Sequence, residues 1–94
     1  MTLPTFADYE ALARSHGAED VLERRWDANQ VVELHAHPFE AQALVTAGEM
    51  WLIRGDRTEH LQAGDSFHLL PDTPHSERYG PEGATYWVAR RARG

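Results

Sequence analysis

The sequence contains no cysteine and no lysine, and all of its apolar runs are short. Without cysteine, disulfide bonds and thiol nucleophiles are excluded. No apolar stretch approaches the length that a membrane-spanning helix requires. The first residues also show neither the basic start nor the apolar run of a signal peptide. We therefore expect a cytoplasmic protein with no membrane partner.

Basic charge is scarce as well. The 94 residues carry a formal net charge of −6, and all nine basic residues are arginine. They form no basic stripe, so the surface repels phosphates and we expect no nucleic acid partner. A glycine-rich phosphate loop is also missing. The length predicts a single domain over residues 1–94.

A short amphipathic helix is expected in the N-terminal segment, residues 1–19. Thr5 is typical of a helix N-cap and Gly17 of the position just past a helix end. Between them the apolar residues recur at helical spacing and form one stripe: Phe6, Tyr9, Leu12 and Ala13. Such a helix needs a surface to lie on, because a short helix is marginal in isolation.

Residues 20–94 show the pattern of short strands separated by turn residues. The pair Gly55-Asp56 is typical of a two-residue hairpin. Many short strands at close spacing predict an all-β fold, an antiparallel sandwich or barrel. The eight expected strands cover residues 21–26, 31–37, 41–47, 49–54, 59–61, 66–70, 77–79 and 85–89.

The candidate site begins with His35-Ala36-His37. Alternate residues of a strand point to the same face about 6.6 Å apart, so both imidazoles can reach one metal ion at about 2.0–2.1 Å. His75 follows a proline-marked turn, where the backbone can aim a side chain into a cavity. The three histidines together predict a metal site inside a β-barrel.

These residues resemble the cupin family, whose members are double-sheet jelly rolls that hold a metal between the sheets. The first cupin motif is matched by His35, His37 and Gly48, and the second by Gly64, Pro71, Pro74 and His75. Asn29 and Asp72 stand where the motifs usually have glycine. Asparagine tolerates a left-handed backbone better than most residues, so the first departure is mild. The resemblance covers residues 29–75 and implies a jelly-roll β-barrel with one metal.

One departure affects the metal ligands. The family's glutamate ligand falls on Ala41 or, with the longer spacing, on Gln42. Ala41, Ala43 and Val45 form a small apolar face that suits the barrel interior. We therefore favour three histidines with water in the missing position, and Gln42 remains a possible fourth ligand. The expected cofactor is one divalent ion, which is Zn, Fe, Mn, Ni or Cu.

Glu33 has the same strand parity as His35 and His37, so we expect its carboxylate near the same cavity. Two interpretations stand side by side: a general base or imidazole-orienting group, and a strand-end carboxylate that reaches solvent. Nothing in the sequence suggests a serine nucleophile.

Two functions fit these features. The first is a metal-dependent enzyme acting on a small oxygen-rich molecule such as a sugar acid or keto acid. The second is a non-catalytic ligand-binding or sensor domain, which the missing carboxylate favours. The sequence does not separate them. We also expect a homodimer, because so small a domain leaves much of its apolar surface exposed.

Overall fold

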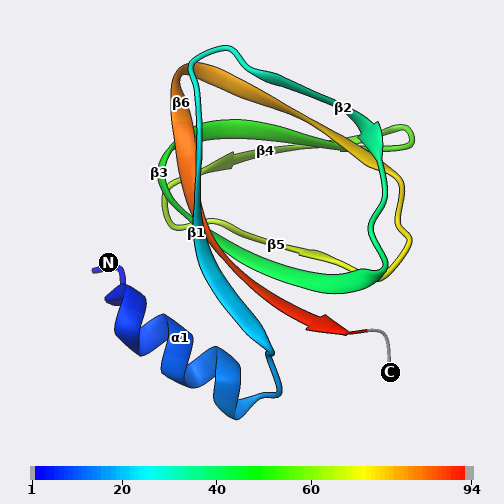
Figure 1. Ribbon diagram of the computed structural model, residues 1–94. Helices are drawn as coiled ribbons and strands as arrows, with labels where there is room; N and C mark the ends of the chain where they lie inside the picture. Colours follow the sequence, from blue (N-terminus) through cyan, green and yellow to red (C-terminus); the bar gives the residue numbers. More distant parts are fainter. Residues whose placement is uncertain (1, 93–94) are drawn as a thin grey trace.

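The computed structural model describes residues 2–92 and shows one helix and six strands, all antiparallel (Figure 1). The helix α1 (Phe6–Ser15) precedes all strands. The strands are β1 (Asp20–Trp26), β2 (Val31–His35), β3 (Phe39–Arg54), β4 (Arg57–Gln62), β5 (Ser66–Leu69) and β6 (His75–Ala92). No helix in this range is long and apolar enough to cross a membrane.

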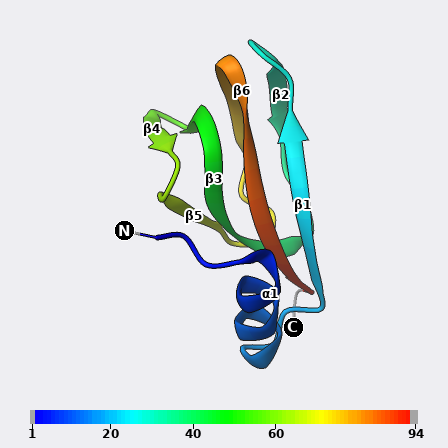
Figure 2. The ribbon, with the colours of Figure 1, turned by 90° about the vertical axis from the view of Figure 1, so that its left-hand side faces the viewer.

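The six strands form one sheet that folds over into two facing layers. The long strands β3 and β6 pair from Phe39–Ala92 to Ile53–Ser76 and pass through both layers. The first layer adds β1 and β5, and the second adds β2 and β4. Figure 2 shows β3 and β6 side by side between the outer strands. The expected jelly-roll architecture is confirmed, although the sheet does not close into a complete barrel.

Six strands replace the expected eight because two glycine-containing segments are creases rather than turns. Gly48 lies within β3, and the segment 80–83 lies within β6. Gly48 has a φ of 74°, and a Cβ added there would lie 2.1 Å from the Gly83 carbonyl oxygen. Side chains would keep the two strands apart here, so glycine lets each strand bend from one layer into the other.

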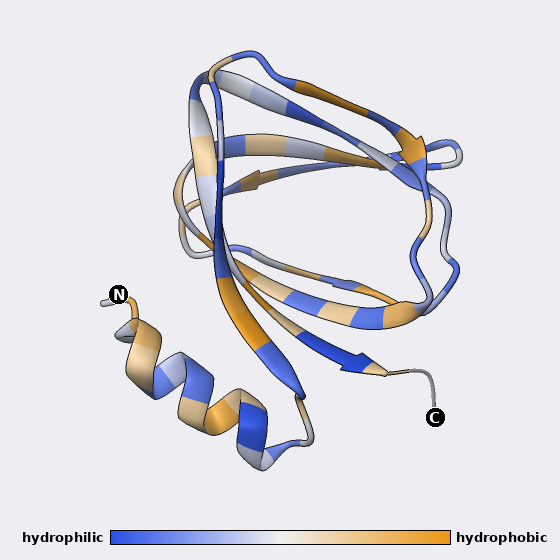
Figure 3. Ribbon diagram, in the orientation of Figure 1, coloured by the Kyte–Doolittle hydropathy of each residue, from blue (hydrophilic) through white to orange (hydrophobic). Residues whose placement is uncertain are grey.

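The core lies between the layers and follows the alternation of β3. Ala41, Ala43 and Val45 are buried in the first layer, and Met50 and Leu52 in the second. The parity of the buried positions changes at the crease, where the register shifts. An extra residue at such a bulge moves the following side chains to the other face. Figure 3 shows the alternating hydropathy along β3.

The helix α1 packs on the outer face of the first layer. The Thr5 hydroxyl accepts a hydrogen bond from the Asp8 amide at 3.1 Å, which confirms the expected N-cap. Gly17 follows the helix end with a φ of 100°. Phe6 and Tyr9 meet Trp87 edge to face, with ring centroids 5.5 and 5.7 Å apart. The aromatic contact to Trp87 therefore holds α1 on the sheet.

Candidate metal centre

Two strands of the second layer and one connecting segment bring the three histidines together. His35 ends β2, His75 begins β6, and the two are partners across the antiparallel pair. His37 lies in the connection between β2 and β3. The amide of Asp72 donates to the His37 carbonyl oxygen at 2.8 Å, which ties the turn before β6 to this connection. In Figure 1 the end of β2 lies beside the start of β6.

The three imidazoles converge on one point. One ring nitrogen from each of His35, His37 and His75 lies within 4.8 Å of the other two. The ring centroids are 4.2 Å apart for His35 and His75, and 5.0 Å apart for His37 and His75. Nitrogen ligands of one ion, each about 2.0–2.1 Å from it, must lie within about 4.2 Å of each other, so small rotamer adjustments complete the geometry.

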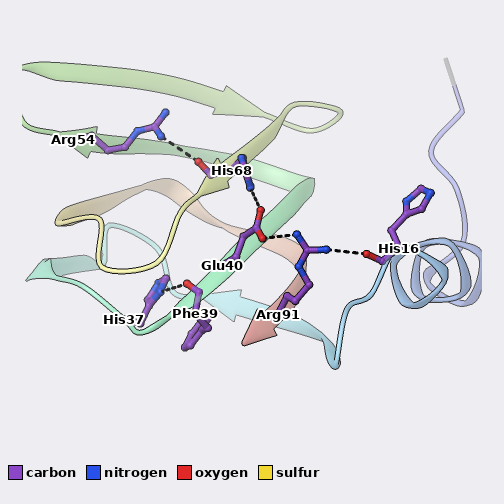
Figure 4. A network of polar contacts seen from close by, with 7 residues as sticks. All are labelled: His16, His37, Phe39, Glu40, Arg54, His68 and Arg91. Atoms are coloured by element: carbon purple, nitrogen blue, oxygen red, sulfur yellow. Dashed lines mark hydrogen bonds and ion pairs between the residues drawn. The ribbon is translucent and has the colours of Figure 1, made fainter. Parts of the chain in front are cut away.

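The other ring nitrogen of each histidine faces a backbone carbonyl. Nδ1 of His35 donates to the Glu33 carbonyl and Nδ1 of His75 to the Thr73 carbonyl, both at 2.8 Å. Nδ1 of His37 lies 3.4 Å from the Phe39 carbonyl (Figure 4). A carbonyl only accepts, so Nδ1 carries the hydrogen and Nε2 keeps a free lone pair. This tautomer prepares all three Nε2 atoms as metal ligands.

His75 is the most buried of the three, at 1% exposure. Burial lowers the pKa of His75 below its ordinary value of 6.5, and this effect outweighs the hydrogen bond to Thr73, which raises it. The nearby His35 and His37 lower the pKa of His75 further, while the Glu77 carboxylate raises it. The neutral imidazole is the form that binds metal, so the surroundings of His75 favour metal binding at neutral pH.

A buried carboxylate that the sequence reasoning missed lies beside the histidines. Oε2 of Glu77 is 3.5 Å from Nε2 of His75 and 3.7 Å from Nε2 of His35. Its other oxygen accepts a short hydrogen bond from the Tyr79 hydroxyl. The available signal was the spacing: Glu77 follows His75 by two residues, as His37 follows His35, and alternate strand residues share a face.

The histidines open into a cavity of about 120 Å³ between the layers. Its lining combines apolar side chains with the donors of Arg24 and Arg90 and the phenol of Tyr86. Trp26 also lines the cavity, and its buried indole Nε1 lies beside the Tyr86 hydroxyl.

Glu33 lies outside this cavity, which corrects the expectation from parity. Its side chain is exposed, and only its backbone carbonyl contributes to the site, through His35. A register shift between Val32 and His35 is the physical reason. Val32 packs against the core although it lies an odd number of residues from His35, so strict alternation fails here.

Gln42 also lies elsewhere, so it is not the fourth ligand. It is exposed on the outer face of β3 and lines a larger groove of about 470 Å³ beneath α1. Ala41 is buried and lines the histidine cavity, as the favoured register requires. Within residues 2–92, the groove beneath α1 contains no cluster of metal ligands.

Glu40 of β3, His68 of β5 and Arg91 of β6 form a network of polar contacts outside the cavity (Figure 4). Glu40 accepts hydrogen bonds from His68 and, at 2.8 Å, from Arg91. Arg91 also donates to the His16 carbonyl at 3.0 Å, which links the end of α1 to β6. The pKa of Glu40 is lowered, first by the hydrogen bond from His68 and then by that from Arg91. His16 and His68 therefore have a structural role outside the site.

Comparison with known proteins supports the same architecture. A family model described as "Cupin domain" matches residues 23–88. An RmlC-like cupin from Shewanella frigidimarina is 25% identical with a TM-score of 0.66, and the match covers 78% of this chain and 66% of the other. A conserved protein with a double-stranded β-helix domain from Klebsiella pneumoniae is 25% identical with a TM-score of 0.67, covering 77% and 65%.

A DMSP lyase from Ruegeria pomeroyi is a third similar structure. It is 25% identical with a TM-score of 0.66, and the match covers 77% of this chain but 36% of the lyase. No curated protein sequence matches the chain significantly. The chain thus spans about two thirds of the first two structures and about a third of the lyase.

Proposed function

Because the chain belongs to the cupin family, we propose that it is a metal-dependent enzyme acting on a small oxygen-rich acid, such as a sugar acid or keto acid. His35, His37 and His75 hold one divalent ion, which is Zn, Fe, Mn, Ni or Cu. A bound ion of this kind polarises a carbonyl or enolate oxygen of the substrate. The grouping of one ring nitrogen from each of the three histidines within 4.8 Å carries this proposal.

The size of the cavity supports a small substrate. At about 120 Å³ it is well below the roughly 300–1,000 Å³ of pockets for drug-sized ligands. It lies between the two layers, where apolar walls exclude water and strengthen the interaction between charges.

The positive charge at the cavity supports an acidic substrate. The guanidinium of Arg24 lies 4.8 Å from the Trp26 ring centroid, and that of Arg90 lies 5.0 Å from the Phe39 ring centroid. Stacking on an aromatic ring restricts an arginine side chain and leaves its N–H groups pointing past the ring. Nη2 of Arg90 donates to Asp20 at 3.2 Å, so its other nitrogens are the ones we propose for a carboxylate.

The proposal is tested with metal-loaded protein and a panel of small sugar acids and keto acids, followed by proton NMR. We expect turnover that requires the metal and is absent in His75→Ala. Binding without turnover would favour the sensor interpretation, and no binding of any acid would contradict the proposed substrate class.

An arginine substitution tests the binding of the acid separately from the binding of the metal. Arg90→Gln should weaken acid binding at least 10-fold, about 1.4 kcal/mol, with the metal affinity unchanged. Arg78→Gln is the matched control, because Arg78 also stacks on an aromatic ring, that of Trp51, but does not line the cavity. Equal effects of the two substitutions would contradict a role for Arg90 in binding.

We also propose that the chain forms a homodimer in the cytoplasm, through α1 and β1. Among the described residues, β1 pairs only with β6, so its other edge is available to a second chain. Sedimentation at micromolar concentration should give a dimer, and a monomer would contradict the proposal.

A further inference from the structure

Glu77 presents an unusual electrostatic arrangement. Its side chain is only 6% exposed, and its Oε2 faces Nε2 of His75 and of His35 at 3.5 and 3.7 Å. Both histidines carry their hydrogen on Nδ1, toward backbone carbonyls. Two lone pairs and a carboxylate oxygen therefore point toward one another with no hydrogen between them. Such a group of acceptors is unfavourable unless a proton or a metal cation lies among them, and a metal ion can meet both nitrogens and the oxygen at once.

The separations suit a shared ion. Two ligand atoms that are each about 2.0–2.1 Å from one ion, at a tetrahedral angle, lie about 3.3–3.4 Å apart. The two distances from Glu77 are close to this value. Glu77 thus stands beside His35 and His75 in the way that a fourth ligand would. It lies outside the group of ligand atoms that are all within 4.8 Å of one another, so its carboxylate must move closer to His37 to share the ion.

Tyr79 holds the carboxylate in this orientation. Its hydroxyl donates to Oε1 of Glu77, which leaves Oε2 directed at the histidines. The Tyr79 ring is fixed in turn by stacking on Trp26, with centroids 5.2 Å apart. Hydrogen bonds of this kind orient metal-binding carboxylates.

The opposite wall explains why a carboxylate is needed at this position. Ala41 stands where the first cupin motif expects glutamate, and its methyl group lines the same cavity as Glu77. We propose that Glu77 of β6 is the fourth protein ligand of the metal and replaces the glutamate that is missing at Ala41 of β3. This inference rests on the metal site of the proposed function.

The test measures the metal alone. Co²⁺ is titrated into the metal-free protein and its visible absorption is recorded, and Zn²⁺ affinity is measured by competition with a chromophoric chelator. We expect Glu77→Gln to lower metal affinity at least 10-fold and to change the Co²⁺ spectrum, because loss of groups that merely orient ligands already costs about 10–100-fold. Glu33→Gln, which alters an exposed carboxylate near His35, should change neither.

Two further variants separate ligand loss from structural damage. Tyr79→Phe keeps every ligand but frees Oε1, so it should lower affinity less than Glu77→Gln does. In a Glu77→Ala background, Ala41→Glu should restore part of the affinity, because it returns a carboxylate to the opposite wall. Circular dichroism of the metal-free variants checks that each one is folded.

The outcomes distinguish this inference from the proposed function. If His75→Ala abolishes metal binding while Glu77→Gln keeps the affinity and spectrum of the unmodified protein, Glu77 is not a ligand and the three-histidine site stands. If His75→Ala binds metal normally, the metal site itself is wrong.

Discussion

The crease at Gly48 offers a sharp test of the fold, because two glycines with similar backbones differ in their surroundings. Gly48 has a φ of 74° and Gly64 a φ of 98°, so alanine is strained at both positions. A Cβ at Gly64 meets nothing within 4 Å, whereas a Cβ at Gly48 would lie 2.1 Å from the Gly83 oxygen and 2.8 Å from the Ala84 Cα. Of these two glycines, Gly48 is the one that combines strain with a backbone clash.

The two substitutions should differ in size. Gly64→Ala should lower the free energy of unfolding by about 1–2 kcal/mol, the cost of a left-handed backbone with a side chain. Gly48→Ala should lower it by at least about 4 kcal/mol, because the clashing atoms belong to the backbone and move only if β3 and β6 separate. For a domain of this size, each kcal/mol corresponds to about 4–8 °C in Tm.

Urea unfolding followed by tryptophan fluorescence, together with thermal unfolding, measures both variants. The loss expected for Gly48→Ala approaches the whole free energy of unfolding of a small domain. A largely unfolded protein is therefore an expected result for this variant. Losses that agree within about 0.5 kcal/mol would show that β3 and β6 do not approach closely at the crease.

Three further outcomes follow from particular contacts. His37→Ala should remove the metal-dependent stabilisation, which is about 2.7 kcal/mol at a metal concentration 100-fold above Kd, and thermal shift measures it. The lowered pKa of Glu40 adds stability that is present above its ordinary value of 4.5 and lost as the pH falls through its folded value. Glu40→Gln should therefore be less stable in urea at pH 7, by less than about 1 kcal/mol, with no deficit at about pH 3. Thr5→Ala should lower the free energy of unfolding by about 1 kcal/mol through loss of the N-cap, measured by urea unfolding.

Predictions from the local sequence were correct where a few neighbouring residues determine the backbone conformation. The cap at Thr5 and the hairpin at Gly55-Asp56, which pairs Arg54 with Arg57, depend on a few neighbouring residues. Asn29 and Asp72 adopt φ values of 58° and 61° where the motifs have glycine. These are short-range preferences of the backbone, and they are readable before the fold is known.

Predictions from the local sequence were wrong where a strand bends or where its pairing register shifts. Gly48 looked like a turn because glycine can end a strand as well as bend it, and only the approach of Gly83 shows which applies. Glu33 was placed by strict alternation, but the shift between Val32 and His35 breaks it. Bulges depend on pairing with a distant strand, here β6, so the local sequence does not locate them.

The sequence by itself determined the layered β fold and the three histidines, because strand periodicity and motif spacing follow from covalent geometry along the chain. Only the tertiary structure decided which carboxylate accompanies them. Glu77 lies beside His35 because the start of β6 pairs with β2, and Gln42 lies under α1 because the register of β3 directs it outward. Contacts between strands distant in sequence depend on how the whole sheet folds over. No single segment of the sequence specifies that folding.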